Sequence, residues 1–124
     1  MIQGVVTEDR EVVICLTIRG ADGRDHEVDA VIDTGFDGWL SLPAAALAEM
    51  GFEWRQRGRA FLADGGESVF DIYEDIVVWD GQPRRVPIHQ AETTPLVGMS
   101  LLDDYEVTFQ VRRSGNVIIR KLTS

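Results

Sequence analysis

One short stretch of the chain carries residues that could do chemistry. Asp33, Thr34 and Gly35 directly follow the apolar segment 30–32, and the chain becomes apolar again over 39–42. Asp is disfavoured in strands, and burial of its charge requires a partner or a raised pKa. An acid, a hydroxyl and a glycine at the end of an apolar strand therefore cost stability, and we expect a functional site there.

Strands are expected to bring Asp33 to that position. Over 11–20, apolar residues alternate with polar ones, which is typical of a half-buried strand. Asp22-Gly23 favours a hairpin turn, and the segment 26–32 is predicted to return as a strand that leads into Asp33. The apolar-rich segment 1–7 is predicted to be a further strand.

One clear helix is predicted after the site, over 43–51. Proline suits its first turn, the alanines that follow favour helix, and Gly51 is a typical C-terminal stop.

The second half of the chain is rich in predicted strands. They cover 59–63, 67–79, 84–90, 105–111 and 117–122, with turns at 64–66, 80–81 and 114–116 and a short helical turn over 99–104. Tyr105, Val107, Phe109 and Val111 alternate with polar residues, which predicts that they share one inward face. The pattern indicates a single domain, 1–124, of mainly β class, closed or sandwich-like, with one or two short helices.

Composition limits the partners. The net charge of −9 argues against nucleic acid and anionic membranes, which require a basic surface, although solubility alone also explains such a charge. No segment has the pattern of a signal peptide or a membrane span, so a cytoplasmic location is expected. Cys15 is the one cysteine, and its apolar neighbours Ile14 and Leu16 predict a small buried side chain rather than a nucleophile.

Other chemistries fit the sequence poorly. His26-Glu27 begins a zinc-protease pattern, but Ala30 stands where the second histidine is needed. Asp33 and Asp37 resemble part of a calcium loop, but Ala44 occupies the position of the bidentate glutamate. Neither histidine has metal ligands at suitable spacing, and no serine elbow or phosphate-binding glycine loop is present.

The order of several features is more specific than the D-T-G triplet, whose simplest explanation is an Asp-initiated turn. An apolar strand precedes the triplet, a glycine-tipped hairpin over 61–70 follows, and Leu96-Val97-Gly98 with a helical turn comes about sixty residues after it. From about Val12 to Arg120 the chain thus resembles the retropepsin-like aspartic proteases, single-lobe relatives of pepsin. The cellular, prokaryotic members, with an active-site stretch similar to D-T-G-F-x-G, are the most alike.

The resemblance implies a role for each residue of the stretch. Asp33 would be the catalytic aspartate, Thr34 would join the two active-site loops across a dimer, and Gly35 would allow close approach of the substrate. Asp37 matches a position that holds the peptide backbone in viral members. Phe36 replaces the small residue of viral enzymes, and its ring would narrow a side-chain pocket, so viral specificities are not transferred.

Two further segments receive roles from the same resemblance. The tip of a flap that closes over the substrate would be Asp64, Gly65 and Gly66. The support packed beneath the active-site loop would be Leu96, Val97 and Gly98. The resemblance implies neither a metal nor a cofactor.

The chemistry of this family requires two carboxylates that share one proton. One carboxylate activates a water molecule and the other protonates the carbonyl oxygen; at about 3 Å apart both cannot be ionised. The chain contains one D-T-G and is too short for a second lobe, so an active enzyme would be a symmetric homodimer with a peptide or protein substrate.

Two alternatives remain open from the sequence. The same dimer would bind peptides or a partner protein without cutting them if Phe36 or a short flap blocked productive binding. In the other alternative, Asp33 caps a turn of a structural or regulatory β-domain, and its replacement by alanine would leave dimerisation and ligand binding unchanged.

Other features have simple structural interpretations. Trp39, Trp54 and Trp79 are expected as core or interface anchors rather than a ligand cage. The arginines that alternate over 55–59 are expected on a solvated strand face. The hairpin 105–122 would be able to join its copy in an intersubunit sheet.

Overall fold

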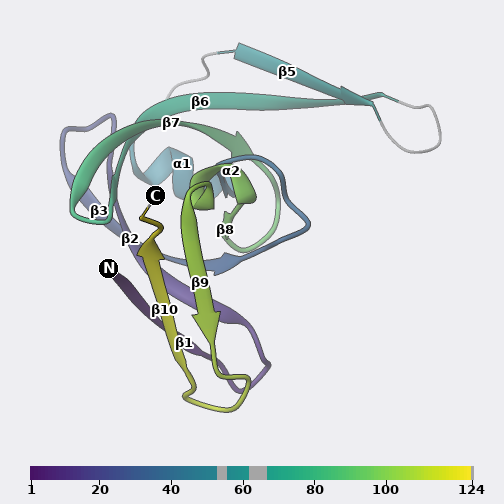
Figure 1. Ribbon diagram of the computed structural model, residues 1–124. Coiled ribbons are helices and arrows are strands. Elements are labelled where there is room, and N and C mark those ends of the chain that lie inside the picture. The colour runs from purple at the N-terminus through teal and green to yellow at the C-terminus, as the bar shows by residue number, and fades with distance from the viewer. Residues whose placement is uncertain (53–55, 62–66, 124) are drawn as a thin grey trace.

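The chain forms a strand-rich structure with two short helices (Figure 1). The computed structural model describes residues 1–52, 56–61 and 67–123, with side chains outside 53–71. Neither α1 nor α2, nor any other helix in these ranges, has the length and apolar character needed to cross a bilayer. The elements are β1 (Ile2–Val6), β2 (Val12–Arg19), β3 (Asp25–Ile32), β4 (Leu40–Leu42), α1 (Ala44–Glu49), β5 (Gln56–Phe61), β6 (Glu67–Trp79), β7 (Gln82–Gln90), β8 (Leu96–Val97), α2 (Met99–Leu102), β9 (Tyr105–Phe109) and β10 (Asn116–Lys121).

Six of the strands close into a barrel. The sheet runs in the order β5-β6-β7-β4-β8-β3-β2-β1-β10-β9, and β6 also pairs with β2 through Thr17↔Val78 and its neighbours. This extra pairing closes the ring β6-β7-β4-β8-β3-β2, and a closed ring leaves no free edges among its strands. The predicted mainly β, closed class with short helices is therefore confirmed.

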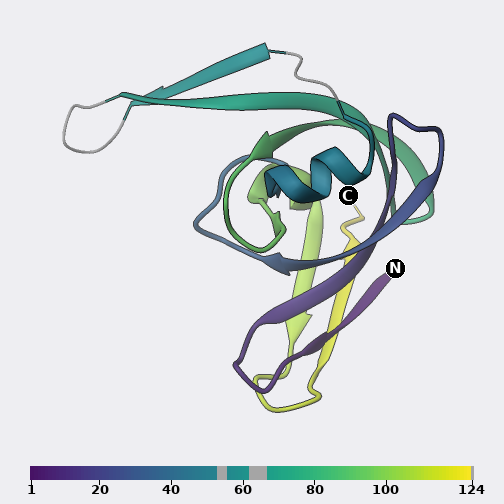
Figure 2. The ribbon, with the colours of Figure 1, turned by 180° about the vertical axis from the view of Figure 1, so that it is seen from behind.

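Two extensions leave the barrel in different directions. The strands β1, β10 and β9 form a wing that projects below the barrel, while β5 and the paired end of β6 project above it (Figures 1 and 2). The hairpin between β5 and β6 was predicted over 59–63 and 67–79, and its first strand begins earlier, at Gln56.

The alternation predicted for the second strand places its apolar side chains in the barrel core. The fully buried residues of β2 are Ile14, Leu16 and Ile18. The burial predicted for Cys15 is wrong, because the same period of two turns this side chain outward, and it is exposed beside Asp29 of β3. Partial desolvation, followed by the carboxylates of Glu27 and Asp29, raises the pKa of the Cys15 thiol, which disfavours a thiolate nucleophile.

The helix α1 ends as its sequence predicts. Gly51 adopts a positive φ of 78°, its N–H donates to the carbonyl of Ala48, and the N–H of Phe52 donates to the carbonyl of Leu47, both at 3.0 Å. This pair of bonds is a Schellman motif, in which glycine adopts the left-handed conformation at no steric cost. Leu47 is buried and fixes the helix against the barrel core.

The tryptophans fit the prediction where the structure describes them. Trp79 is buried in the core, and Trp39 is half-buried against it with the Arg84 guanidinium 5.0 Å from its ring centroid. Trp54 and the side chains of the arginines at 55, 57 and 59 lie outside the described residues.

Only two of the four side chains predicted to share an inward face over 105–111 are even partly buried. Tyr105 and Val107 are half-buried, but β9 ends at Phe109, and Phe109 and Val111 are 45% and 63% exposed. The reason is the wing, which carries the far end of the hairpin beyond the barrel, where no element of the described chain covers it (Figure 1).

Candidate functional site

The loop 33–39 is shaped by a strand that lies between the two strands it connects. β8 pairs in parallel with β3 through Ile32↔Val97 and antiparallel with β4 through Leu40↔Val97. The chain that leaves β3 must therefore pass over the end of β8 before it can enter β4. This arrangement places Asp33 at the point where the chain leaves the barrel wall.

Four backbone hydrogen bonds and one from the Ser100 side chain fix this loop to the segment 97–100. They join both ends and the middle of the loop to 97–100, so the two segments form one rigid unit. These bonds are Asp33 N to Val97 O (2.9 Å), Gly98 N to Trp39 O (2.9 Å), Met99 N to Phe36 O (2.8 Å), Ser100 N to Gly38 O (3.0 Å) and Ser100 Oγ to Asp37 O (2.5 Å).

The Asp33 side chain is held by its own turn. The N–H of Gly35 donates to Asp33 Oδ1 at 2.9 Å, and the N–H of Phe36 donates to the Asp33 carbonyl at 3.2 Å. Such an Asx turn fixes the orientation of a carboxylate. Asp33 is half-buried, and Thr34 and Gly35 beside it are exposed, so the triplet lies at the surface.

Phe36 packs against the loop itself. A Cβ placed on Gly38 would lie 2.6 Å from the Phe36 ring, and one placed on Gly98 would lie 2.7 Å from it. The ring therefore fills the space that these two glycines leave. Its other neighbour is His89, whose ring meets it edge-on, with centroids 5.5 Å apart and planes at 65°.

His89 was predicted to be a structural histidine, and its place beside the loop was missed. It lies on β7, where the parallel pairing with β4 sets it opposite Ser41. Burial lowers the pKa of the His89 imidazole, and the nearby Asp37 carboxylate partly opposes this effect. The pairing of β7 with β4 joins segments far apart in the chain, so no local pattern in the sequence indicated it.

The other predicted site residues divide into two groups. Leu96, Val97 and Gly98 lie beneath the loop, where Val97 and Gly98 are buried. The predicted flap tip, Asp64-Gly65-Gly66, lies outside the described residues. The structure thus brings 33–37 and 96–98 together, while the functional roles given to them stay predictions.

No metal centre stands out among the described side chains, those of residues 1–52 and 72–123, where no three His, Cys, Asp or Glu gather in a way that would hold an ion. His26 instead contacts the Asp22 carboxylate at 3.0 Å, next to the turn between β2 and β3.

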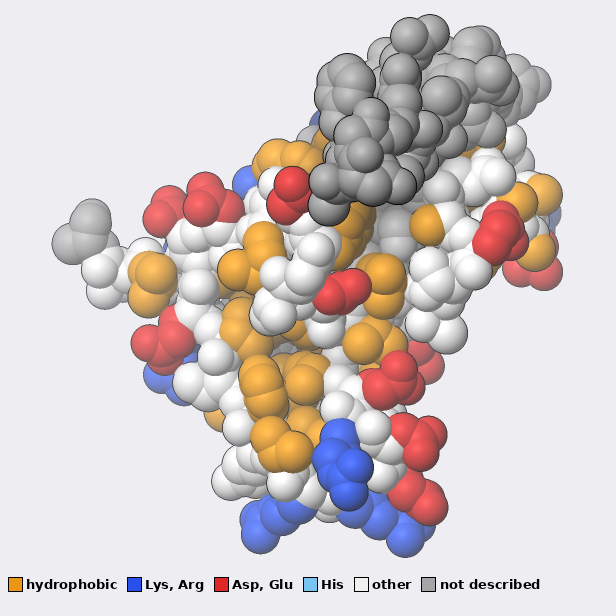
Figure 3. All heavy atoms as spheres, turned by 90° about the vertical axis from the view of Figure 1, so that its right-hand side faces the viewer, with side chains coloured by type: hydrophobic (Ala, Val, Ile, Leu, Met, Phe, Trp, Pro, Cys, Tyr) orange, Lys and Arg blue, Asp and Glu red, His pale blue; other side chains and the backbone are white. Residues whose placement is uncertain are grey.

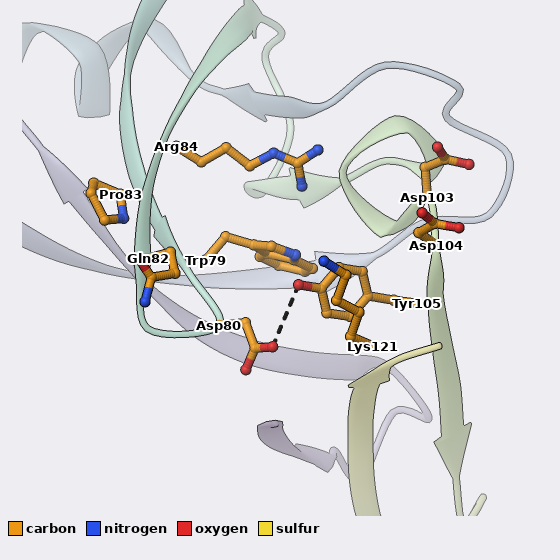
Figure 4. A pocket seen from close by; sticks show the side chains of 9 residues that line it. All are labelled: Trp79, Asp80, Gln82, Pro83, Arg84, Asp103, Asp104, Tyr105 and Lys121. Atoms are coloured by element: carbon orange, nitrogen blue, oxygen red, sulfur yellow. Dashed lines mark hydrogen bonds between the residues drawn. The ribbon is translucent and has the colours of Figure 1, made fainter. Parts of the chain in front are cut away.

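In the part of the chain that the structure describes, two hollows on the surface share Asp103 in their lining. A shallow one of about 260 Å³ borders the loop and is lined by Asp37, Trp39, Met99, Ser100 and Asp103. A larger one of about 360 Å³ contains none of the predicted site residues, and Figure 4 shows its lining by Trp79, Asp80, Gln82, Pro83, Arg84, Asp103, Asp104, Tyr105 and Lys121.

Some of the residues that line the larger hollow contact one another. The rings of Trp79 and Tyr105 meet edge-on at 5.6 Å, and the Tyr105 hydroxyl donates to Asp80 at 3.4 Å (Figure 4). Its charged side chains carry both signs.

Comparison with known proteins supports the fold. No protein-family model and no curated protein matches the chain. Among solved structures, the chain is similar to the crystal structure of a retropepsin-like aspartic protease from Rickettsia conorii. The two are 16% identical with a TM-score of 0.61, and the match covers 98% of this chain and 91% of that one. The chain therefore has the single-lobe retropepsin-like fold.

Proposed function

We propose that this retropepsin-like chain is an aspartic endopeptidase that acts as a homodimer and hydrolyses peptide bonds with water activated between two Asp33 carboxylates. One observation carries the proposal: in a retropepsin-like fold, the single D-T-G lies in a surface loop that is hydrogen-bonded to the segment after β8. A carboxylate fixed in this way is preorganised for proton transfer, which is what general acid–base catalysis requires.

In the proposed reaction, the two Asp33 side chains divide the work. The ionised carboxylate takes a proton from water, whose oxygen bonds to the peptide carbonyl carbon, while the protonated carboxyl gives its proton to the carbonyl oxygen. The carbon–nitrogen bond then breaks as the nitrogen receives a proton, which leaves a carboxylic acid and an amine. The Gly35 N–H keeps Asp33 Oδ1 oriented during both transfers.

The other predicted site residues have roles in dimer contact, substrate binding and loop support in this proposal. Thr34, exposed at the turn, would bond to the opposite loop of the dimer, and the exposed Asp37 would hold the substrate backbone. Asp64, Gly65 and Gly66 would close over the peptide as a flap, and Leu96, Val97 and Gly98 would keep the loop in shape from below. No metal or cofactor is needed for these steps.

A second copy is the partner that the proposal requires, and the surface supports one. Large hydrophobic residues are exposed on the wing and on α2, among them Val5, Phe109, Val111 and Met99. Figure 3 shows hydrophobic side chains gathered along the middle of one face, with Lys and Arg side chains at its lower end. Clustered exposed hydrophobic residues are typical of protein interfaces.

The proton shared by the two carboxylates predicts an acidic pH optimum. At alkaline pH both Asp33 groups are ionised and neither can donate, whereas at very low pH both are protonated and none can accept. We expect kcat/KM against pH to be bell-shaped, with its maximum at acid to mildly acid pH. A profile that is flat from acid to alkaline pH would contradict the shared proton.

Mixed dimers test whether each active site needs two subunits. A fixed amount of wild type, refolded with a fourfold excess of Asp33→Asn subunits and assayed at saturating substrate, should keep about one fifth of its activity, because most wild-type subunits then pair with an inactive one. The control is the same mixture combined after separate refolding. Undiminished activity after joint refolding would show that one subunit suffices.

A further inference from the structure

The ring of Phe36 occupies space that a side chain at either of two nearby glycines would need. A Cβ on Gly38 would stand 2.6 Å from both Cε1 and Cζ of Phe36, and a Cβ on Gly98 would stand 2.7 Å from its Cδ2. Both distances are far below van der Waals contact, so the ring in this position requires glycine at 38 and 98. Packing thus explains why glycine follows two residues after Phe36 in the F-x-G pattern of the loop.

His89 closes the same space from the side of β7. Its Cε1 would lie 2.9 Å from a Cβ on Gly38, and its ring meets Phe36 edge-on. The backbone of His89 is paired on both sides, with Ser41 of β4 and Ile72 of β6, so the point from which the imidazole extends is fixed. Its half-burial lowers the pKa of this imidazole, which favours the neutral ring for aromatic packing.

The position of the ring is coupled to that of the catalytic carboxylate. The Phe36 N–H donates to the Asp33 carbonyl at 3.2 Å, and the Phe36 carbonyl accepts from Met99 N–H at 2.8 Å. A displacement of the Phe36 backbone, such as loss of the packing around its ring would allow, would therefore also move the Asp33 backbone.

We propose that Phe36 and His89 are positioning residues. The Phe36 ring, held between Gly38, Gly98 and His89, supports the catalytic loop from inside and takes no part in substrate selection. This inference rests on the proposed peptidase function for its kinetic effects. It is an alternative to the expectation that the Phe36 ring narrows a side-chain pocket. A displacement of about 1 Å in a catalytic group can cost up to about 100-fold in rate, so an internal prop has a large kinetic consequence.

A double-mutant cycle between positions 36 and 38 tests the shared space. Gly38→Ala in the wild-type background should lower kcat about tenfold, since the new methyl group displaces the ring. In a Phe36→Ala background the same change should cost less than about threefold, because the two contacts with the ring are gone and the one with His89 Cε1, at 2.9 Å, remains. An equal cost of Gly38→Ala in both backgrounds would overturn the proposal.

The kinetic parameters and a conservative rescue separate positioning from substrate contact. Phe36→Leu and His89→Ala should lower kcat with KM and the order of preference among a peptide panel unchanged, while His89→Phe, which keeps an aromatic wall, should restore most of the rate. A changed preference at constant kcat would assign Phe36 to the substrate pocket instead. The matched control is His26→Ala, at the opposite end of β3, where full activity is expected.

A spectroscopic readout keeps the inference testable if the chain cleaves nothing. In ¹H–¹⁵N spectra, His89→Ala and Phe36→Leu should shift the amide signals of Gly35 and Ser100, which belong to the bonded loop unit, and His26→Ala should leave them in place. If the Gly35 and Ser100 signals of folded variants do not shift, the positioning role of Phe36 and His89 is refuted. If the signals shift and no peptide is cleaved, only the proposed peptidase function is refuted.

Discussion

Replacing Asp33 by asparagine is expected to reduce peptide cleavage by at least about 10³-fold, because an amide neither accepts nor donates the proton that both steps need. The fold should persist, since asparagine still accepts the Gly35 N–H through its side-chain oxygen. The measurement is the release of products from a diverse peptide library at acid pH, with the circular dichroism spectrum and the oligomeric state recorded in parallel.

The control for this experiment is Asp29→Asn, the same chemical change in the same strand. Asp29 lies opposite Cys15 on the outer face of β3 and is exposed, so its activity should stay within twofold of wild type. Equal products from wild type and Asp33→Asn would remove the peptidase proposal. If both proteins bind the same peptides and neither cuts them, the chain is instead a peptide-binding dimer of the same fold.

The parts of the fold that were predictable are those specified by neighbouring residues. The alternation over 11–20 located β2, and Asp80-Gly81 predicted a turn in which both residues adopt positive φ, at 52° and 78°. The helix α1 ends at Glu49, and Gly51 adopts the left-handed conformation that the predicted glycine stop requires. In each case one or two local interactions decide the conformation, and the sequence contains both partners.

The parts that local patterns could not show depend on contacts between distant segments. The insertion of β8 between β3 and β4 brings 96–98 under the loop. β8 has only two residues, which is too short for a sequence pattern that would show in which direction it pairs. The pairing of β7 with β4 places His89 against Phe36 in the same way. Resemblance to a family supplied the first of these contacts and not the second.

Exposure was predicted least well where the barrel ends. The alternation over 105–111 correctly indicates a strand with two different faces, but the presence of an element that covers one face is a tertiary fact. Phe109 and Val111 extend past the barrel on the wing and are exposed. A second copy of the chain would cover these residues, so this surface is a candidate interface for the homodimer that the proposed mechanism requires.

Gly98→Ala should destabilise the protein by about 3 kcal/mol and remove most of its activity, because the new methyl group has no space. The backbone at Gly98 is extended, with φ −97° and ψ 173°, so alanine could adopt the conformation itself. The obstacle is the Gly38 carbonyl oxygen, which would stand 2.2 Å from the new Cβ. That oxygen belongs to the loop and accepts the Ser100 N–H, so the loop must leave its support for the methyl group to fit.

Urea unfolding and peptide cleavage together measure this effect, with Gly23→Ala as the matched control. Gly23 has a positive φ of 80° in the open turn between β2 and β3, and a Cβ there would meet nothing within 4 Å. Its replacement should cost about 1 kcal/mol from backbone strain and leave kcat unchanged. A Gly98→Ala protein as stable and active as wild type would show that the loop is not held by 97–100, and the preorganised Asp33 on which the peptidase proposal depends would lose its structural basis.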